Sequence, residues 1–274
     1  MPEGPEIKRA ADAIARAIAH QPLTEVFFAF EHLKPYSKKL EGQQVIAVEP
    51  RGKALLTRFD NQLNIYSHNQ LYGKWMIRKA HNYPDTNRQL RLALHTAKKS
   101  ALLYSASDIE LLHDDELAVH PFLERIGPDV LHPSTTLKQV IARFQDKTFH
   151  RRQLTTLLLD QGFLSGLGNY LRSEILFVAG VFPKQRPVDC TDQQIKALAQ
   201  AAIALPQQSY ETGGITNDLQ RVEALKAKGF RRSAYRFYVF NREGQPCFHC
   251  ETPIIKDHTG GRRYYFCPRC QSSE

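Results

Sequence analysis

The chain opens with hydrophobic residues at helical spacing. Ile7, Ala11 and Ile14 recur every three or four residues, and Pro5 suits the first turn of a helix. A glutamine and a proline at 21–22 are typical of the end of such an element. We therefore expect a helix from about residue 5 to residue 18.

The next segment, residues 23–107, shows the period-two alternation that is typical of strands. Short alternating runs separated by turn residues favour an antiparallel sandwich or barrel. The expected strands cover residues 25–30, 44–49, 54–59, 63–67, 74–79, 90–96 and 101–105.

From residue 108 onward the pattern becomes helical. Turn residues at 127–129, Gly-Pro-Asp, form the natural joint between the two halves. Beyond about residue 237 the pattern returns to short strands interrupted by cysteine pairs. The expected helices cover residues 108–117, 136–144, 153–159, 170–179 and 192–204.

Four of the five cysteines occur as two CxxC pairs, separated by sixteen residues: Cys247, Cys250, Cys267 and Cys270. This spacing is typical of a four-thiolate zinc site, and four thiolates close the tetrahedral shell, so we expect one structural Zn²⁺. A pair of redox dithiols is the alternative, which is less favoured because the two pairs occur together without a βαβ pattern. Cys190 is left over, and we expect an unreactive buried thiol there.

These patterns together predict an α+β protein of several domains. An antiparallel sandwich or barrel with a leading helix occupies residues 1–126, followed by a joint at 127–131. A helical domain covers residues 132–236, and a β-hairpin zinc ribbon covers residues 237–271.

Composition and charge narrow the class of partner. No apolar run approaches the ~18 residues that span a bilayer, so a role in the membrane is not expected, and the start lacks the pattern of a secretory signal. We therefore expect a cytoplasmic protein. Its 37 Lys and Arg exceed its 28 Asp and Glu, for a net charge of +9. Residues 221–274 carry eleven basic and five acidic residues interleaved with aromatics, which favours nucleic acid over a merely solvated surface.

The amino terminus is a chemical candidate. If Met1 is removed, Pro2 carries a free secondary amine, and a terminal amine has a pKa of about 8. Such an amine can attack an aldehyde-level carbon and form an iminium, with Glu3 and Glu6 as acid and base partners. Met-Pro-Glu is also an ordinary start, and on these residues alone that ordinary interpretation is the favoured one.

Five segments taken together, in order along nearly the whole chain, carry a resemblance. They are MPEGPE at 1–6, SHNQLYG at 67–73, HPFLERIGPDVL at 120–131, GLGNYLRSEIL at 166–176 and GRRYYFCPRCQ at 261–271. With them the chain resembles the formamidopyrimidine-DNA glycosylase/endonuclease VIII family of bifunctional DNA repair enzymes. The resemblance implies an antiparallel β-sandwich as the first domain, a helix-two-turns-helix motif in the helical domain and damaged double-stranded DNA as partner. It implies no small-molecule cofactor and a protein that can act as a monomer.

The resemblance also implies catalytic roles. Pro2 matches the nucleophile that attacks the anomeric carbon, and Glu3 matches the acid that protonates the sugar ring oxygen. Glu6 matches a supporting carboxylate. Lys53 matches a basic residue near the lesion phosphate, where the residues alone predict only a charged turn. Arg262 matches the ribbon arginine that binds phosphates and assists elimination.

Further matches imply contacts with DNA. A second arginine, Arg263, follows Arg262, so which of the two has the ribbon role stays open. The family's tip that fills the gap left by an extruded nucleotide matches Gln70, Leu71 and Tyr72, and its phosphate ligand matches Asn169. Without the resemblance, these are a surface hairpin and a glycine junction between helices. Arg125 matches a DNA-binding position and Asp129 the joint. The stretch 220–235 is longer and more basic than is typical of the family, which indicates only added phosphate contact.

We therefore expect a base-excision repair glycosylase and AP lyase, associated with the nucleoid. It would remove oxidised bases, chiefly pyrimidines, and nick the strand by β,δ-elimination. The alternative within the family is an 8-oxoguanine and formamidopyrimidine glycosylase. The alternative from another class is a non-catalytic zinc-ribbon protein that binds nucleic acid, in which Pro2 is incidental.

Overall fold

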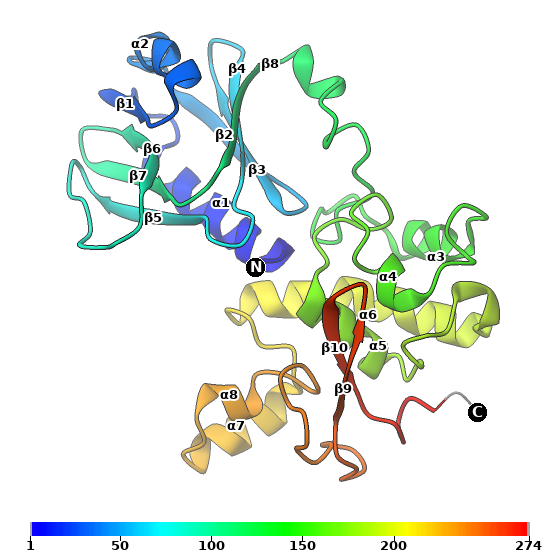
Figure 1. Cartoon of the computed structure of the whole chain (residues 1–274). Coiled ribbons are helices and arrows are strands. Elements are labelled where there is room, and N and C mark those ends of the chain that lie inside the picture. The colour runs from blue at the N-terminus through cyan, green and yellow to red at the C-terminus, as the bar shows by residue number, and fades with distance from the viewer. Residues whose placement is uncertain (1, 273–274) are drawn as a thin grey trace. The chain divides into compact units, whose positions relative to one another are not determined.

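The structure is a computed structural model that describes residues 2–272. The chain divides into two compact units, residues 1–125 and 126–274. Figure 1 shows a unit made mostly of strands, coloured from blue to blue-green, and a mostly helical unit coloured from green to red. The subdivision of the second unit into a helical domain and a ribbon stays a prediction.

The first unit is an antiparallel sandwich behind a leading helix, α1 (Gly4–Ile18). One sheet has the order β1 (Glu25–Phe28), β6 (Leu90–His95), β7 (Lys99–Tyr104) and β5 (Lys74–Lys79). The other has the order β2 (Val45–Arg51), β3 (Ala54–Phe59), β4 (Leu63–His68) and β8 (Asp108–His113). The predicted sandwich and leading helix are confirmed; the short helices η1 (Glu31–Tyr36) and α2 (Ser37–Leu40) were not predicted.

Alternate residues of both sheets and one face of α1 form a single core. Ile14 of α1 is fully buried with Ile65 of β4 and Leu103 of β7. Because α1 contacts β2 in one sheet and β7 in the other, the start of the chain is fixed against the sandwich.

The predicted helix at 108–117 is wrong. Residues Asp108–His113 form strand β8, which pairs with β4 through Leu111 opposite Ile65, and a short 3₁₀ helix, η2 (Glu116–Ala118), follows. Apolar residues at 109, 111 and 112 suit a helix or a strand equally well in so short a run. Pairing with a strand more than forty residues earlier decides the outcome.

The second unit is built on helices. They are α3 (Leu137–Gln145), α4 (Leu154–Leu157), α5 (Asn169–Val178), η3 (Pro187–Asp189), α6 (Asp192–Glu211), α7 (Leu219–Ala227) and α8 (Arg232–Tyr235). Capping boxes at Thr136 and Thr191 begin α3 and α6, because each threonine oxygen accepts a backbone N–H of the first turn. Phe144, Leu171 and Leu198 belong to one fully buried core.

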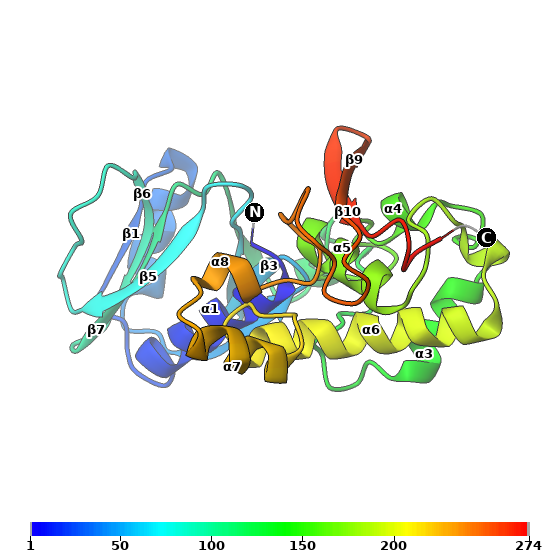
Figure 2. The ribbon, with the colours of Figure 1, turned by 90° about the horizontal axis from the view of Figure 1, so that it is seen from below.

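Two expectations for this unit need correction. Helix α6 continues past residue 204 to Glu211 with Pro206 inside it, because Leu205 and Ser209 continue its buried face. Helices α7 and α8 were not predicted; Figures 1 and 2 show them side by side. Beyond residue 237, the predicted β-hairpin is confirmed: in the described part of the chain, β9 (Ile255–Thr259) and β10 (Arg262–Phe266) pair antiparallel.

Among the residues that the structure describes, no helix is both long enough and apolar enough to cross a membrane.

Candidate functional site

The first candidate residues are built into the start of α1. The Glu3 carboxylate accepts the backbone N–H of Glu6, and the Glu6 carboxylate accepts the backbone N–H of Glu3 at 3.0 Å. This reciprocal capping box buries Glu3 to 3% exposure, while Pro2 beside it stays half-buried. A carboxylate at a helix amino terminus is also favoured by the helix dipole. Pro2 is thus joined directly to a fixed, buried acid.

Lys53 lies in the tight turn between β2 and β3, where Gly52 takes a left-handed conformation with φ of 61°. Lys53 is only 5% exposed, which is unusual for a charged turn residue. An ordinary lysine in a surface turn keeps its ammonium in water, so this burial distinguishes Lys53 from a merely charged turn residue.

His68 and Asp108 are candidates that the sequence analysis missed. His68 pairs with Ala54, next to Lys53, and with Asp108 on its other side; its Nδ1 lies 4.0 Å from the Asp108 carboxylate. Burial lowers the pKa of His68, the charge of Lys53 lowers it further, and Asp108 opposes them. His68 therefore favours its neutral form. Its signal in the sequence was a histidine inside the SHNQLYG segment.

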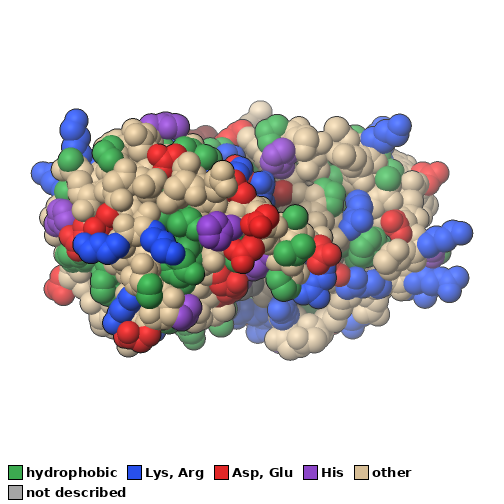
Figure 3. Space-filling model, turned by 90° about the horizontal axis from the view of Figure 1, so that it is seen from above, with side chains coloured by type: hydrophobic (Ala, Val, Ile, Leu, Met, Phe, Trp, Pro, Cys, Tyr) green, Lys and Arg blue, Asp and Glu red, His purple; other side chains and the backbone are tan. Residues whose placement is uncertain are grey.

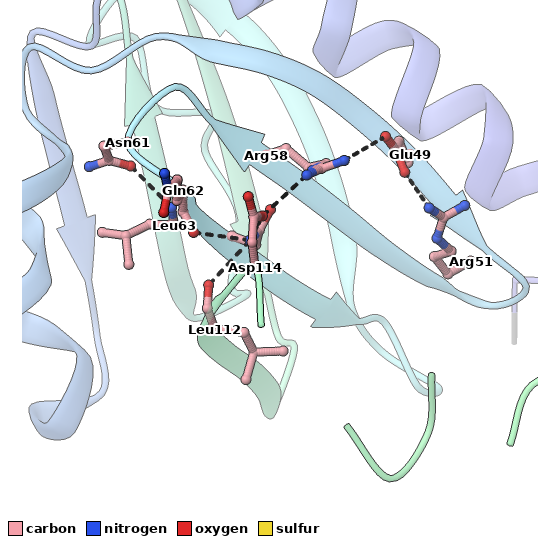
Figure 4. A network of polar contacts seen from close by, with 9 residues as sticks. Glu49, Arg51, Arg58, Asn61, Gln62, Leu63, Leu112 and Asp114 are labelled. Atoms are coloured by element: carbon pink, nitrogen blue, oxygen red, sulfur yellow. Dashed lines mark hydrogen bonds and ion pairs between the residues drawn. The ribbon is translucent and has the colours of Figure 1, made fainter. Parts of the chain in front are cut away.

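A chain of polar contacts crosses the sheet that carries the Lys53 turn (Figure 4). Arg51 donates to the Glu49 carboxylate at 2.5 Å. The Arg58 guanidinium lies 3.8 Å from the Glu49 carboxylate and 3.1 Å from that of Asp114. Asn64 also donates to Asp114, at 2.8 Å. These contacts join β2, β3 and β4 to the end of β8 and so stiffen the support of the turn.

The Gln70–Leu71–Tyr72 tip joins β4 of one sheet to β5 of the other, so it is not a hairpin within one sheet. Leu71 is 63% exposed and Tyr72 is 71% exposed. The turn closes through a bond from the Gly73 N–H to the Asn69 carbonyl, and a Cβ on Gly73 would lie 2.6 Å from the Asn69 backbone. A tightly built turn therefore holds two large apolar side chains in water.

In the second unit, Asn169 is the first residue of α5 and is half-buried. The preceding glycines shape its approach: Gly166 has a φ of 91°, and Gly168 caps the helix in an extended conformation. The glycine junction and helix start expected from the sequence are both present.

Arg172, which the sequence analysis missed, ties α5 to the ribbon hairpin. It is fully buried and donates to the Thr155 carbonyl at 2.7 Å and to the Arg263 carbonyl at 2.8 Å. Its guanidinium also lies 5.5 Å from the Tyr264 ring centre. Because a buried guanidinium needs these acceptors, the main chain beneath Arg263 is held against α5.

The hairpin presents its two arginines at a two-residue turn. Gly260 and Gly261 both have positive φ, as this type of turn requires. Arg262 and Arg263 follow and are exposed. Both arginines are therefore available to a ligand, and the geometry does not choose between them.

Glu174, two residues after Arg172, is a second buried charge that the sequence analysis missed. Its carboxylate accepts the Thr216 hydroxyl at 2.5 Å and the backbone N–H groups of Tyr238, Val239 and Phe240 at 2.8 to 2.9 Å. Burial raises the pKa of Glu174, and the four donors act against that rise. Glu174 thereby holds the chain that leads into the ribbon.

The four paired cysteines converge. Their sulfur atoms all lie within 4.8 Å of one another, and Cys247 to Cys270 and Cys250 to Cys267 measure 3.8 and 3.4 Å. Metal–sulfur bonds of about 2.3 Å in a tetrahedron place sulfurs about 3.8 Å apart, so this donor set fits a zinc ion. A hydrogen bond with Thr252 lowers the pKa of Cys250 to about 6, whereas burial raises the pKa of Cys267 and of Cys270. Because zinc binds the thiolate form, its binding would release protons from these cysteines.

The remaining candidates lie at the surface or the joint. Arg125 is exposed, with its Nε donating to the Pro121 carbonyl at 2.7 Å. The Asp129 carboxylate accepts the Leu131 N–H at 2.9 Å, and the backbone at Asp129 forms an isolated parallel β-bridge with Ser165. Cys190 is half-buried rather than buried, and burial raises the pKa of its thiol to about 11, which makes it a poor nucleophile.

Comparisons with known proteins agree with the motifs. The family model described as the formamidopyrimidine-DNA glycosylase N-terminal domain matches residues 1–107, and the corresponding H2TH domain matches residues 126–221. Endonuclease 8 of Escherichia coli (strain K12 / DH10B) is 49% identical over 271 residues, which cover 99% of this chain and 100% of the relative. Endonuclease 8 of Klebsiella pneumoniae (strain 342) matches equally well.

Solved structures agree on the fold. Lactococcus lactis formamidopyrimidine DNA glycosylase bound non-covalently to DNA with an AP site has a TM-score of 0.81 at 20% identity, covering 99% of this chain and all of that one. The complex of the same bacterium's enzyme with DNA containing an oxidised pyrimidine has a TM-score of 0.81 at 21% identity and the same coverage. The predicted fold class is confirmed.

We expect the purified protein to contain about one metal ion per chain, and that ion to be zinc. Cys267→Ser removes a buried ligand and should abolish this stoichiometry, whereas Cys190→Ser should leave it intact because Cys190 lies outside the cluster. Elemental analysis of the two variants checks this. Equal metal content in both variants would contradict the site.

Glu174→Gln should destabilise the second unit by about 3 kcal/mol, because an amide offers one acceptor and turns its own donors toward the four donors already there. Thermal unfolding measures the change. Glu124→Gln, at an exposed position, should stay within about 0.5 kcal/mol of the wild type. Equal stability of the two variants would show that Glu174 does not hold the ribbon segment.

Proposed function

The chain belongs to the formamidopyrimidine-DNA glycosylase/endonuclease VIII family of bifunctional DNA glycosylases and AP lyases, and we propose that its substrate is duplex DNA with an oxidised base. It removes oxidised bases, chiefly pyrimidines, and cuts the strand at the same position. The observation that carries the proposal is the buried Glu3 beside Pro2, held by the capping box. It gives an amine at the chain end a fixed acid as its neighbour.

The first chemical stage is base removal. With Met1 removed, the Pro2 nitrogen attacks C1′ of the damaged nucleotide, the bond from C1′ to the base breaks, and the base leaves with a proton. Glu3 gives a proton to the ring oxygen, so the sugar opens and an iminium joins Pro2 to C1′. Glu6 supports Glu3 through their shared hydrogen bonds.

The second stage is strand cleavage. The iminium withdraws electrons, so a proton leaves C2′ and the 3′ phosphate departs by β-elimination. A further proton loss expels the 5′ phosphate by δ-elimination, and water then releases the sugar fragment from Pro2. Lys53 and one of the hairpin arginines, Arg262 or Arg263, would bind these phosphates and stabilise their negative charge as they leave.

Access to C1′ requires that the nucleotide leave the base stack. Gln70, Leu71 and Tyr72 would enter the resulting gap, which accounts for two large apolar side chains held in water. Asn169 and Arg125 would contact the backbone. Zinc, when bound, would supply no chemistry beyond closing the ribbon that carries the arginines, because four thiolates leave no open position.

Two alternatives are tested alongside. A purine-directed enzyme is favoured by solved structures of the Lactococcus lactis enzyme with DNA containing Fapy-dG, although these relatives are only about a fifth identical. Rates of excision of thymine glycol and of 8-oxoguanine decide between these two substrate classes. The other alternative is a DNA-binding protein without activity.

The amine chemistry predicts a trapped adduct. Protein whose mass shows that Met1 is absent is incubated with a duplex bearing one thymine glycol, and borohydride is added. We expect a covalent protein–DNA adduct that Pro2→Gly abolishes, because borohydride reduces the iminium. Pro22→Gly, which changes an exposed proline after α1, should leave the adduct unchanged. No adduct from the processed wild type on thymine glycol, 8-oxoguanine or an abasic site would overturn the enzymatic proposal.

A further inference from the structure

The net charge of the protein is concentrated in one segment that has no part in the proposed reaction. On the face shown in Figure 3, basic and acidic side chains are mixed. Residues 219–236, by contrast, hold six basic residues and a single acidic one, a net charge of +5 out of +9. They form α7, α8 and the turn between them, which we name the α7–α8 arm.

The arm is a folded element with its own small core. Val222 and Tyr235 are buried together with Ile215. The Asp218 carboxylate caps α7 by accepting the Arg221 N–H at 2.8 Å, and Gly229, with φ of 78°, ends the helix. Charges on this arm therefore have defined positions.

Three of its arginines are used within the protein. Arg221 donates to the Asn217 side chain at 3.0 Å, Arg232 to the Gly213 carbonyl at 2.5 Å, and Arg236 to the Gly214 carbonyl at 2.6 Å. These bonds fasten both ends of the arm to the segment that follows α6.

Arg221 also fastens the arm to the cysteine site. Its guanidinium lies 4.9 Å from the ring centre of Phe248, the residue after Cys247, and the Arg242 guanidinium lies 3.5 Å from the same ring. Two cations thus contact the aromatic ring of the first CxxC pair. The arm is therefore attached to the ribbon as well as to α6.

The other basic side chains lie at the free end of the arm. Lys228 and Arg231 are exposed, and within the described residues no carboxylate pairs with either. Lys226 is also exposed and pairs with Glu223 at 2.7 Å. Phe230, 52% exposed, stands between Lys228 and Arg231 in the sequence. Exposed cations that flank an exposed aromatic residue in the sequence are the side chains that complement a polyanion with apolar sugar faces.

We propose that the α7–α8 arm is an additional binding surface for the phosphate backbone of duplex DNA, with Lys228 and Arg231 as its phosphate contacts. The proposal rests on the proposed function, because it takes DNA to be the protein's ligand. Backbone contacts carry no sequence information, so the arm contributes equally to intact and damaged duplexes. It does not depend on the chemistry at Pro2.

The test is the salt dependence of binding to an intact duplex and to one with an abasic-site analogue. The slope of log K against log salt is negative, and we use the word slope for its magnitude. Each lost phosphate contact lowers this magnitude by about 0.9, so the double variant Lys228→Ser with Arg231→Ser should lower it by about 1.8 on both duplexes. The control variant, Lys98→Ser with Lys99→Ser, removes the same charge at the start of β7. This end of the strand is the one farther from the 70–72 tip, so the slope should stay unchanged. Glu223→Gln frees Lys226 and should raise the slope.

A wild-type slope in the Lys228 and Arg231 double variant would overturn the arm's role, and so would a loss on the damaged duplex alone. Zinc content and thermal unfolding of that variant should match the wild type, because both side chains are exposed. Borohydride trapping by the wild type is measured separately. A lowered slope with no trapping would support the arm and reject the enzymatic proposal, whereas trapping with an unchanged slope would reject the arm alone.

Discussion

Two oppositely charged side chains buried on one helix organise the second unit. Arg172 and Glu174 lie two residues apart on α5. Arg172 donates to the main-chain carbonyl of residue 263, and Glu174 accepts main-chain N–H groups of residues 238–240, all more than sixty residues later. A buried charge that loses its partners costs several kcal/mol. The hairpin that carries Arg262 and the chain at 238–240 therefore cannot shift independently of α5. Because Asn169 begins the same helix, one element sets the positions of the candidate phosphate ligands.

At the start of the first unit, two carboxylates serve both the fold and the proposed reaction. The hydrogen bonds that begin α1 are made by Glu3 and Glu6, the same carboxylates that the proposed reaction needs. The acid therefore needs no separate support, because the helix that packs on both sheets holds it. Lys53 is likewise a candidate residue that is buried where it joins two elements of the fold, in the turn between β2 and β3.

Features that depend on residues close together in the sequence could be predicted from the sequence alone. The period-two runs located seven strands of the sandwich, and the spacing of the cysteines predicted their convergence. Strand β8 was mistaken for a helix because its pairing with β4 is a long-range contact that a short apolar run does not reveal. Arg172 and Glu174 were missed for a similar reason, since their partners come from distant segments. Both stand as charged residues within a largely apolar helix, and that contrast was the available signal.

The central claim is the proposed chemistry, with Pro2 as the covalent centre. A crystal structure of the borohydride-trapped complex on an abasic duplex tests it most directly. The account predicts a bond from the Pro2 nitrogen to C1′, with Asn169 and a hairpin arginine on the phosphates beside that sugar. An adduct on a lysine side chain, or a trapped sugar whose phosphates contact neither residue, would contradict it.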